Sequence, residues 1–259
     1  MRNVVTFAAL AALAVPFAPL QAQVIETLRI RVGLGAQTTP KWIGADGNDW
    51  SPYPSFAIAR GDKPFGIGAP DDNFSPKVFG SGGFAVGPVA ALEGSRKESE
   101  VGAPVGKVPA TFELGAFAEH NFGAFRVHAQ ARKGIGGHKG TVGHLAADYV
   151  LADGDRYALT IGPRLLFSDA RYQRAYFGVT PEVALATGLD PYSPGGGLHA
   201  LAATAGGNYA LGGDWGLFGY ARYERLVGDA KRSPIVRELG SPNQFSAGIG
   251  ISRTFTLKL

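Results

Sequence analysis

The chain has 259 residues, of which 25 are Lys or Arg and 21 are Asp or Glu, and it has no cysteine. The formal net charge of +4 is too small to indicate a nucleic-acid-binding protein, and the lack of cysteine excludes a fold held together by disulfides. A mean hydropathy of +0.02 excludes a bundle of membrane helices. It is compatible with a membrane β-barrel, in which apolar and polar residues alternate.

The N-terminal residues 1–22 have the features of a secretory signal peptide. Arg2 precedes an apolar stretch at 4–15, and small residues follow up to Ala22. The apolar stretch is shorter than the roughly 20 residues that a membrane-spanning helix needs. We therefore expect cleavage after Ala22, export of the chain, and a single domain over residues 23–259.

Alternation with a period of two dominates the rest of the chain and predicts β-strands. It is clean at 28–37, 111–120 and 124–132, less regular at 141–150, 156–165, 197–211, 214–226 and 247–259, and weak at 53–60, 77–80, 83–92 and 171–178. Only 180–188 predicts a helix, with Thr180 as its N-cap and Pro181 in its first turn. The pattern gives about 12 strands.

Alternation alone fits both a soluble β-sandwich and a membrane barrel. The polar faces favour the barrel, because they combine charged residues with many glycines, as a crowded lumen would. The residues expected to face the lumen are Arg29, Arg31, Glu113, Arg126, His128, Arg164, Arg222 and Glu224. Aromatic residues near strand ends suit an interfacial girdle, and they are Tyr149, Tyr157, Tyr209 and Trp215. We predict an all-β, transmembrane, antiparallel up-and-down barrel with long outer loops, embedded in outer-membrane lipid.

Loop lengths predict the topology, because bacterial barrels keep both chain ends in the periplasm and have short periplasmic turns. Counting back from the C-terminus puts 227–242 and 179–196 outside, and 211–214 and 168–170 inside. The same count puts the long polar segment 93–110 in the periplasm, where a long loop is unusual. Either the strand count is wrong by one upstream, or the barrel has an unusual periplasmic loop.

Three long segments resemble the MipA/OmpV family. They are VGLGAQTTPKWIGADGNDWSPYPSFAIARGD, YFGVTPEVALATGLDPYSPGGGL and RLVGDAKRSPIVRELGSPNQFSAGIGISRTF, which lie near the start, middle and end of the mature chain. The resemblance implies an outer-membrane β-barrel. It also implies, from the name-giving member, a scaffold that connects a murein lytic transglycosylase with a bifunctional murein synthase.

The C-terminus departs from the family pattern, which ends at an aromatic residue equivalent to Phe255. Here residues 256–259 follow, and Phe255, Leu257 and Leu259 stay in phase on the apolar face. We expect these three residues to form the signal for the barrel assembly machinery. Arg253 is on the same face, where a lipid-facing Arg near the midplane costs about 2 to 4 kcal/mol. A β-bulge that turns Arg253 inward would avoid that cost.

No catalytic, cofactor-binding or metal-binding residues are predicted. The glycine-rich run 134–141 has the wrong residue order for a phosphate-binding loop, and the five histidines have no metal-ligand spacing. The segment 45–50 lacks the terminal glutamate of a calcium loop and is interpreted as an outer turn. Asp71 and Asp72 are interpreted in the same way.

Three functions remain open at this point. The first is the non-enzymatic scaffold that the resemblance implies. The second is a narrow channel, because a 12-stranded barrel has a radius of roughly 12 Å, which inward arginines would narrow and make slightly anion-selective. The third is a lipid hydrolase, for which His199 near Ser193 is the one available pair.

Overall fold

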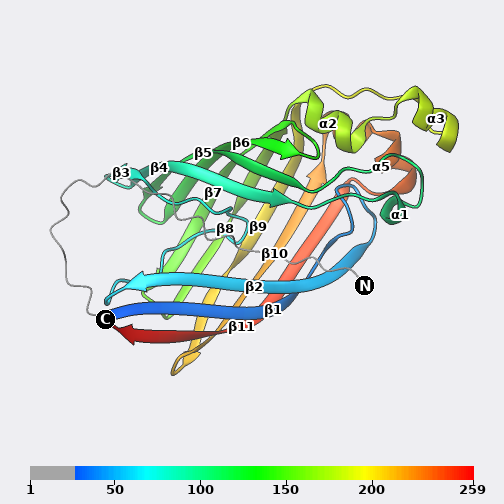
Figure 1. Cartoon of the computed structure of the whole chain (residues 1–259). Coiled ribbons are helices and arrows are strands. Elements are labelled where there is room, and N and C mark those ends of the chain that lie inside the picture. The colour runs from blue at the N-terminus through cyan, green and yellow to red at the C-terminus, as the bar shows by residue number, and fades with distance from the viewer. Residues whose placement is uncertain (1–26) are drawn as a thin grey trace.

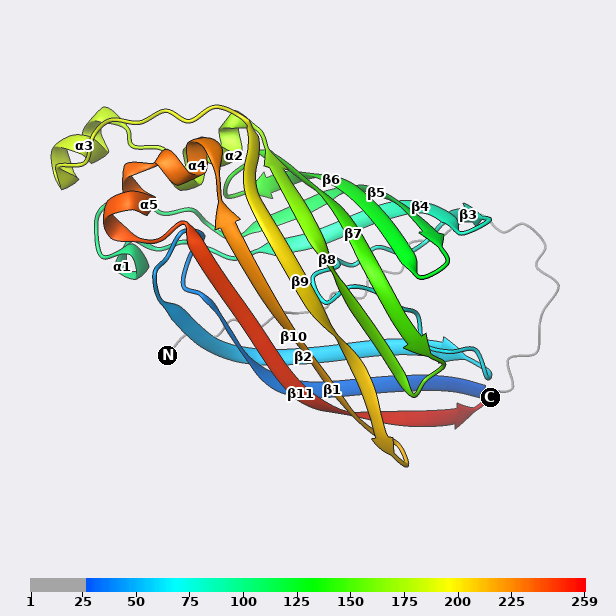
Figure 2. The same ribbon diagram turned by 180° about the vertical axis from the view of Figure 1, so that it is seen from behind.

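The computed structural model describes residues 27–259, so the predicted signal peptide at 1–22 lies outside the described residues. One antiparallel sheet of 11 strands forms the wall of a barrel, in the order β2-β1-β11-β10-β9-β8-β7-β6-β5-β4-β3 (Figure 1). The strands are β1 (Thr27–Pro40), β2 (Asn48–Arg60), β3 (Phe79–Ser81), β4 (Phe84–Glu93), β5 (Thr111–Phe122), β6 (Phe125–Gly136), β7 (Thr141–Asp153), β8 (Tyr157–Ser168), β9 (Gly197–Gly212), β10 (Trp215–Leu226) and β11 (Asn243–Lys258). Figure 2 shows β7 to β10 side by side from behind.

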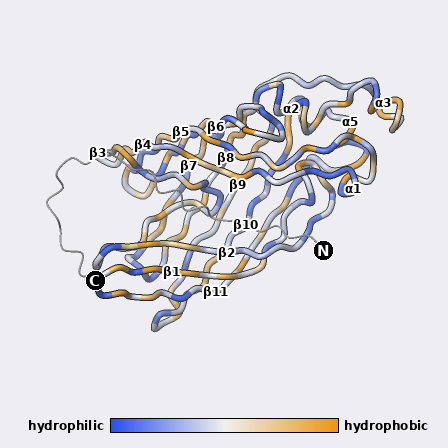
Figure 3. The backbone as a smooth tube through the Cα atoms, viewed as in Figure 1, coloured by the Kyte–Doolittle hydropathy of each residue, from blue (hydrophilic) through white to orange (hydrophobic). Residues whose placement is uncertain are grey.

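The two faces of the wall have the polarity of a membrane protein. On β5 the apolar side chains of Phe112 and Leu114 are exposed. The charged side chains of Glu113 and Glu119, on the opposite face of the strand, are buried. Figure 3 shows the same alternation of apolar and polar residues along the strands. A soluble sandwich would bury the apolar face instead. The prediction of an outer-membrane barrel is therefore confirmed.

One end of the barrel has short turns, at 82–83, 123–124, 154–156 and 213–214. Both termini of the sheet lie at this end, because Thr27 pairs with Lys258. The other end carries the connections 41–47, 94–110, 137–140, 169–196 and 227–242. Bacterial barrels keep both ends in the periplasm, so the short-turn end is periplasmic and the other end faces outward.

Two sequence predictions about topology are wrong, and the errors share one cause. The segment 171–178 belongs to helix α2 (Ala170–Phe177) and not to a strand, and its N-cap Asp169 accepts a hydrogen bond from Tyr172 N at 2.8 Å. The predicted inner turn at 168–170 is therefore the start of an outer connection. Removing this strand from the count moves 93–110 to the outside. The predicted helix at 180–188 is confirmed as α3 (Pro181–Thr187), capped by the Thr180 side chain.

Residues 61–73 form an inner segment that runs through the lumen. An odd number of wall strands would normally place the two chain ends on opposite sides of the membrane, and the inner segment explains why both ends are periplasmic here. It begins beside Thr27, where Gly61 N donates to Thr27 O at 2.9 Å, and rises through the lumen. Phe74 then forms a bridge with Ala90 in the outer half of β4, and the chain descends along β4 into β3. The inner segment thus replaces one upward crossing of the wall.

The outer connections form a packed cap. It contains α2, α3 and the short helices α1 (Glu98–Val101), α4 (Gly228–Arg232) and α5 (Pro234–Leu239), which gather at one end of the barrel in Figure 1. Two apolar clusters hold the cap together, one including Tyr176, Phe177 and Leu226 and the other including Trp42 and Ile235. Within residues 27–259, no helix is both long and apolar enough to cross a membrane.

Arg253 stays on the outer face of the wall, and the bulge proposed to turn it inward is absent, since the register of β11 is continuous on both sides. Its guanidinium lies 5.4 Å from the ring centroids of both Trp215 and Phe255. Trp215 begins β10 directly after a periplasmic turn, so Arg253 lies at the rim and not at the midplane. Aromatic packing at the interface explains why the arginine is tolerated there.

The topology predicts which positions react with a membrane-impermeant maleimide in intact cells. Because the chain has no native cysteine, Lys107→Cys and Leu185→Cys each provide one thiol, and both lie on the outer cap. We expect both variants to be labelled. Asp214→Cys, in a periplasmic turn, should react only after the outer membrane is permeabilised. Labelling of Leu185→Cys without Lys107→Cys would contradict the outer position of 94–110.

Candidate functional site in the lumen

Asp71 attaches the inner segment to the middle of the barrel wall. Its carboxylate accepts hydrogen bonds from Arg164 Nη2 and Nε at 2.9 and 3.0 Å, from Arg222 Nη1 at 2.5 Å and from Thr204 Oγ1 at 3.1 Å. The three partners come from β8, β10 and β9. A paired contact between a guanidinium and a carboxylate fixes geometry as well as charge, so Asp71 holds the inner segment against three adjacent strands.

Asp72 extends this attachment along the same side of the wall to β6. It accepts a hydrogen bond from Arg126 Nη2 at 2.6 Å. Asp148 links the two arginines, at 3.1 Å from Arg126 Nη1 and 2.7 Å from Arg164 Nη1. Every member of this network is buried or nearly so, and a buried charge without a partner is strongly destabilising.

The interpretation of Asp71 and Asp72 as an outer turn is therefore wrong. Nothing in their local pattern indicates burial, because the surrounding segment has no strand or helix periodicity. The sequence contains one indirect signal. The predicted strands place more arginines than carboxylates on the lumen face, so anionic groups from outside the strands are needed to balance the charge.

A second attachment holds the inner segment near the periplasmic end of the lumen. The buried ring of Phe65 lies 4.0 Å from the Arg31 guanidinium and 5.1 Å from that of Arg29. Phe65 N donates to Asp155 Oδ1 at 2.9 Å, and Asp155 also pairs with Arg29. The inner segment is thus held at two levels, by a cation–π contact below and by ion pairs above.

Glycines on the lumen face give the inner segment room. A Cβ at Gly206 would lie 2.7 Å from Pro70 Cγ, and a Cβ at Gly87 would lie 2.0 Å from the Pro76 carbonyl oxygen. Side chains at these positions would displace the segment. Part of the chain's high glycine content therefore follows from packing a polypeptide inside the barrel.

A third set of polar contacts lies nearer the outer end. Glu113 accepts hydrogen bonds from Arg132 Nε at 2.7 Å and pairs with His138 Nε2 at 2.9 Å. His199 is buried beside the ring of Tyr172, and its Nδ1 has no hydrogen-bond partner. Ser193 is exposed on the cap, and no hydrogen bond joins it to His199 within the described residues. The two residues do not form a nucleophile–base pair.

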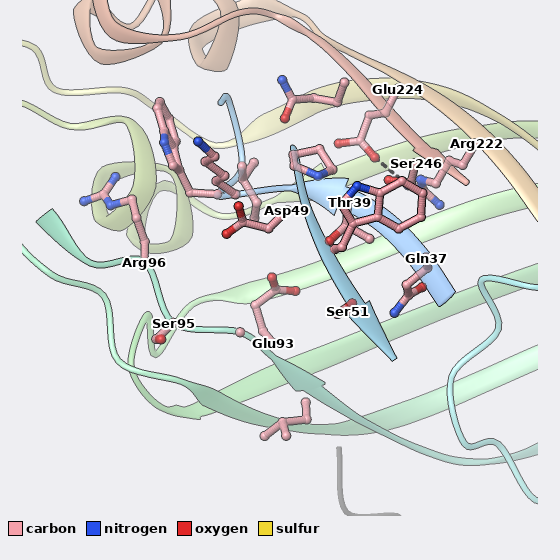
Figure 4. Close-up of a pocket in the computed structure, with 18 of the residues that line it drawn as sticks. Gln37, Thr39, Asp49, Ser51, Glu93, Ser95, Arg96, Arg222, Glu224 and Ser246 are labelled. Atoms are coloured by element: carbon pink, nitrogen blue, oxygen red, sulfur yellow. Dashed lines mark hydrogen bonds and ion pairs between the residues drawn. The ribbon is translucent and has the colours of Figure 1, made fainter. Parts of the chain in front are cut away.

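A pocket of about 790 Å³ lies under the cap, above these contacts (Figure 4). Its polar lining comes from β1, β2, the end of β4 and β10, and includes Gln37, Asp49, Ser51, Glu93, Ser95, Arg222 and Glu224. Glu224 accepts a hydrogen bond from Arg222 at 2.5 Å. The backbone of Glu93 pairs with that of Thr111, but its carboxylate has no hydrogen bond or ion pair within residues 27–259.

Arg96 clamps the cap beside this pocket. It is 2% exposed and donates to the carbonyl oxygens of Tyr176 at 2.5 Å, Gly106 at 3.0 Å and Ala175 at 3.3 Å. Burial lowers the pKa of Arg96 to about 10. Backbone carbonyls thus bind the cation and connect the segment 94–110 to α2.

The structure gives a position to every residue predicted from sequence. Glu113, Arg126, His128 and Arg164 are buried, and Arg29, Arg31, Arg222 and Glu224 are partly buried. Phe255, Leu257 and Leu259 are exposed at the end of β11, and their role in assembly stays a prediction. No group of three or more potential ligands in residues 27–259 could hold a metal ion.

These features define an outer-membrane β-barrel with an occupied lumen. The family model described as MltA-interacting protein MipA matches residues 32–255, and the chain belongs to this family. None of the curated proteins compared with the chain matches it.

Among solved structures, an outer-membrane channel from Pseudomonas putida F1 is 10% identical, with a TM-score of 0.42, over 92% of this chain and 100% of that chain. A porin is 11% identical, with a TM-score of 0.35, over 89% of this chain and 100% of that one. Neisserial surface protein A is 10% identical, with a TM-score of 0.26, over 88% and 97% of the two chains.

The Asp71 network predicts that Asp71→Ala releases the inner segment. Arg164 and Arg222 would lose a shared carboxylate in a buried site, which should reduce the stability of docking by on the order of 3 kcal/mol. Hydrogen exchange of residues 61–73 should accelerate while the wall strands remain protected. Asp62→Ala, in the exposed part of the same segment, is the matched control and should leave exchange unchanged. Equal protection in both variants would contradict the attachment.

Proposed function

We propose that this protein is a non-enzymatic anchor in the outer membrane for murein enzymes. Its partners would be a lytic transglycosylase and, as in the name-giving member of the family, a bifunctional murein synthase. Family membership supports the first partner, because the family is described as MltA-interacting.

The observation that carries the proposal is the attachment of the inner segment across the lumen. Ion pairs from Asp71 and Asp72 to Arg164, Arg222 and Arg126 hold the inner segment in the space through which a solute would pass. The Phe65 contacts hold the segment again below that level. A barrel filled in this way is better suited to present a surface than to conduct.

The periplasmic end is the surface that murein enzymes can reach. It carries exposed charged side chains on short turns and at the chain end: Asp62, Lys63, Asp153, Arg156, Asp214 and Lys258. The segment 94–110 lies at the opposite end, so its polar character no longer favours a periplasmic contact. Short turns on a rigid wall would present a fixed rather than adaptable binding surface.

A narrow channel is the second candidate, and the 790 Å³ pocket under the cap favours it. Conduction would require the inner segment to move, because the segment runs through the lumen and its ion pairs hold it there. The anion preference inferred from the inward arginines belongs to this alternative. In the resting arrangement most of those arginines are paired with carboxylates, which would weaken the preference.

Binding to a purified lytic transglycosylase of the host tests the anchor. The refolded barrel in lipid nanodiscs should bind the enzyme, and a version with 94–110 replaced by a glycine-serine turn should bind equally well. An epitope inserted between Gly212 and Gly213, at the periplasmic end, should reduce binding at least about tenfold through steric exclusion.

The same epitope inserted after Gly188, on the outer cap, is the control and should have no effect. Loss of binding with the Gly188 insertion but not with the Gly212 insertion would contradict a periplasmic contact. Absence of binding by the unmodified barrel would refute the anchor.

A further inference from the structure

The wall is not closed by hydrogen bonds. No ladder joins β2 to β3 or β4 in the part of the chain that the structure describes, and the two edges of the sheet face each other across a seam. In lipid, unpaired backbone groups are costly, so an open seam needs a structural explanation.

Prolines on both edges indicate that the seam is built into the sequence. The backbone N–H of Gly61, the residue directly after β2, donates a hydrogen bond to Thr27 of β1. The N–H groups of odd-numbered β2 residues therefore point toward β1, and those of even-numbered residues point toward the seam. Pro52 and Pro54 are even-numbered and remove two donors from that edge. On β4, Ala90 N donates to Phe74 O, so Pro88 also faces the seam side. Proline in a sheet is confined to such edges.

The seam side of β4 is covered along most of its length. Residues 74–81 run beside β4 from Phe84 as far as Ala90. Beyond Ala90, no strand within residues 27–259 pairs with this edge of β4, and there the pocket lies between residues 49–52 of β2 and residues 92–96 (Figure 4).

The pocket takes residues from both faces of the wall. Ser51, Glu93 and Glu224 belong to the lumen face, whereas Trp50 and Leu92 are on the lipid face and are 76% and 59% exposed. The cavity is therefore lined by residues of both faces of the wall. Its outer rim is apolar and aromatic, and its inner wall is polar.

The carboxylate of Glu93 is available in the pocket, because it has no hydrogen bond or ion pair within residues 27–259. The side chain of Lys41, which also has no ion pair in this part of the chain, lies in the same lining. Glu224, by contrast, is paired with Arg222. Trp42 and Tyr176 add aromatic rings to the lining. A carboxylate beside aromatic rings binds organic ammonium groups.

We propose that the outer end of the seam, beyond Ala90, is a lateral portal, through which an amphipathic amine enters the pocket from the outer leaflet. The ammonium group binds Glu93, and the alkyl chain remains between Trp50 and Leu92 toward lipid. This proposal is independent of the binding of murein enzymes. The amine would reach the pocket from the lipid and would not have to pass the inner segment in the lumen below.

Tryptophan quenching tests the portal. The chain has three tryptophans, and a Trp215→Phe background leaves Trp42 and Trp50, both at the pocket. The protein is reconstituted in phosphatidylcholine vesicles and titrated with 11-bromoundecylamine, with 11-bromoundecanol as the uncharged match. We expect saturable quenching by the amine, and a half-saturating concentration about tenfold higher in Glu93→Gln.

Glu182→Gln, on the exposed α3, is the matched control and should bind as the parent does. Circular dichroism checks that Glu93→Gln retains its β-structure. Equal quenching by amine and alcohol, or equal affinity in Glu93→Gln and its parent, would overturn the proposal.

A cross-link tests the route. Ser51→Cys and Ser95→Cys place thiols on opposite sides of the seam, and a bis-maleimide bridge between them should abolish quenching by the amine. The reagent on Ser51→Cys alone should leave quenching in place. Persistent binding after bridging would refute the lateral route.

Vesicle composition separates two sources of the ammonium group. Weaker amine binding in phosphatidylethanolamine vesicles than in phosphatidylcholine vesicles would identify the aminolipid headgroup as a competing occupant. Equal binding would identify a free amphipathic amine as the ligand. Both results agree with an ammonium site at Glu93.

Discussion

The structure depends on the ion pairs that join Asp71 and Asp72 to Arg164, Arg222 and Arg126. The arginines come from the alternate strands β6, β8 and β10 on one side of the wall, and their mutual repulsion in a confined lumen requires carboxylates between them. Asp148 from the wall supplies one such group, and the inner segment supplies the others. The wall and the inner segment therefore stabilise each other. Without the inner segment the wall arginines would lose carboxylate partners, and without the wall Asp71 and Asp72 would lose their arginines.

The seam and the cap follow from the same constraint. Because the inner segment crosses the lumen, 11 strands suffice to bring both ends to the periplasmic side, and β2 and the short β3 beside β4 become the edges of the sheet. Prolines on those edges reduce the number of unpaired donors in lipid. On the outside, the long connections pack into a cap, where carbonyl oxygens hold the buried cation of Arg96. The result is a barrel with a polypeptide segment through its lumen and a pocket of about 790 Å³ under its cap.

Much of the wall could be predicted from sequence, because alternation on strands such as β5 and β6 is a local property with a fixed period. Helix α2 could not, since eight residues with mixed polarity fit a short strand as well as a helix. The roles of Asp71 and Asp72 depend on residues 54 to 151 positions away in the chain, which no local pattern contains. The prolines on β2 and the many glycines were visible, but their meaning depends on which strands are neighbours.

Conductance in planar bilayers tests the central claim, that the inner segment fills the lumen. The wild-type barrel is compared with a version in which residues 64–73 are replaced by a glycine-serine linker of equal length, which removes Phe65, Asp71 and Asp72 together. The account predicts little or no steady current through the wild type and a defined conductance through the variant. A wild-type conductance equal to that of the variant would show that the segment does not block the lumen.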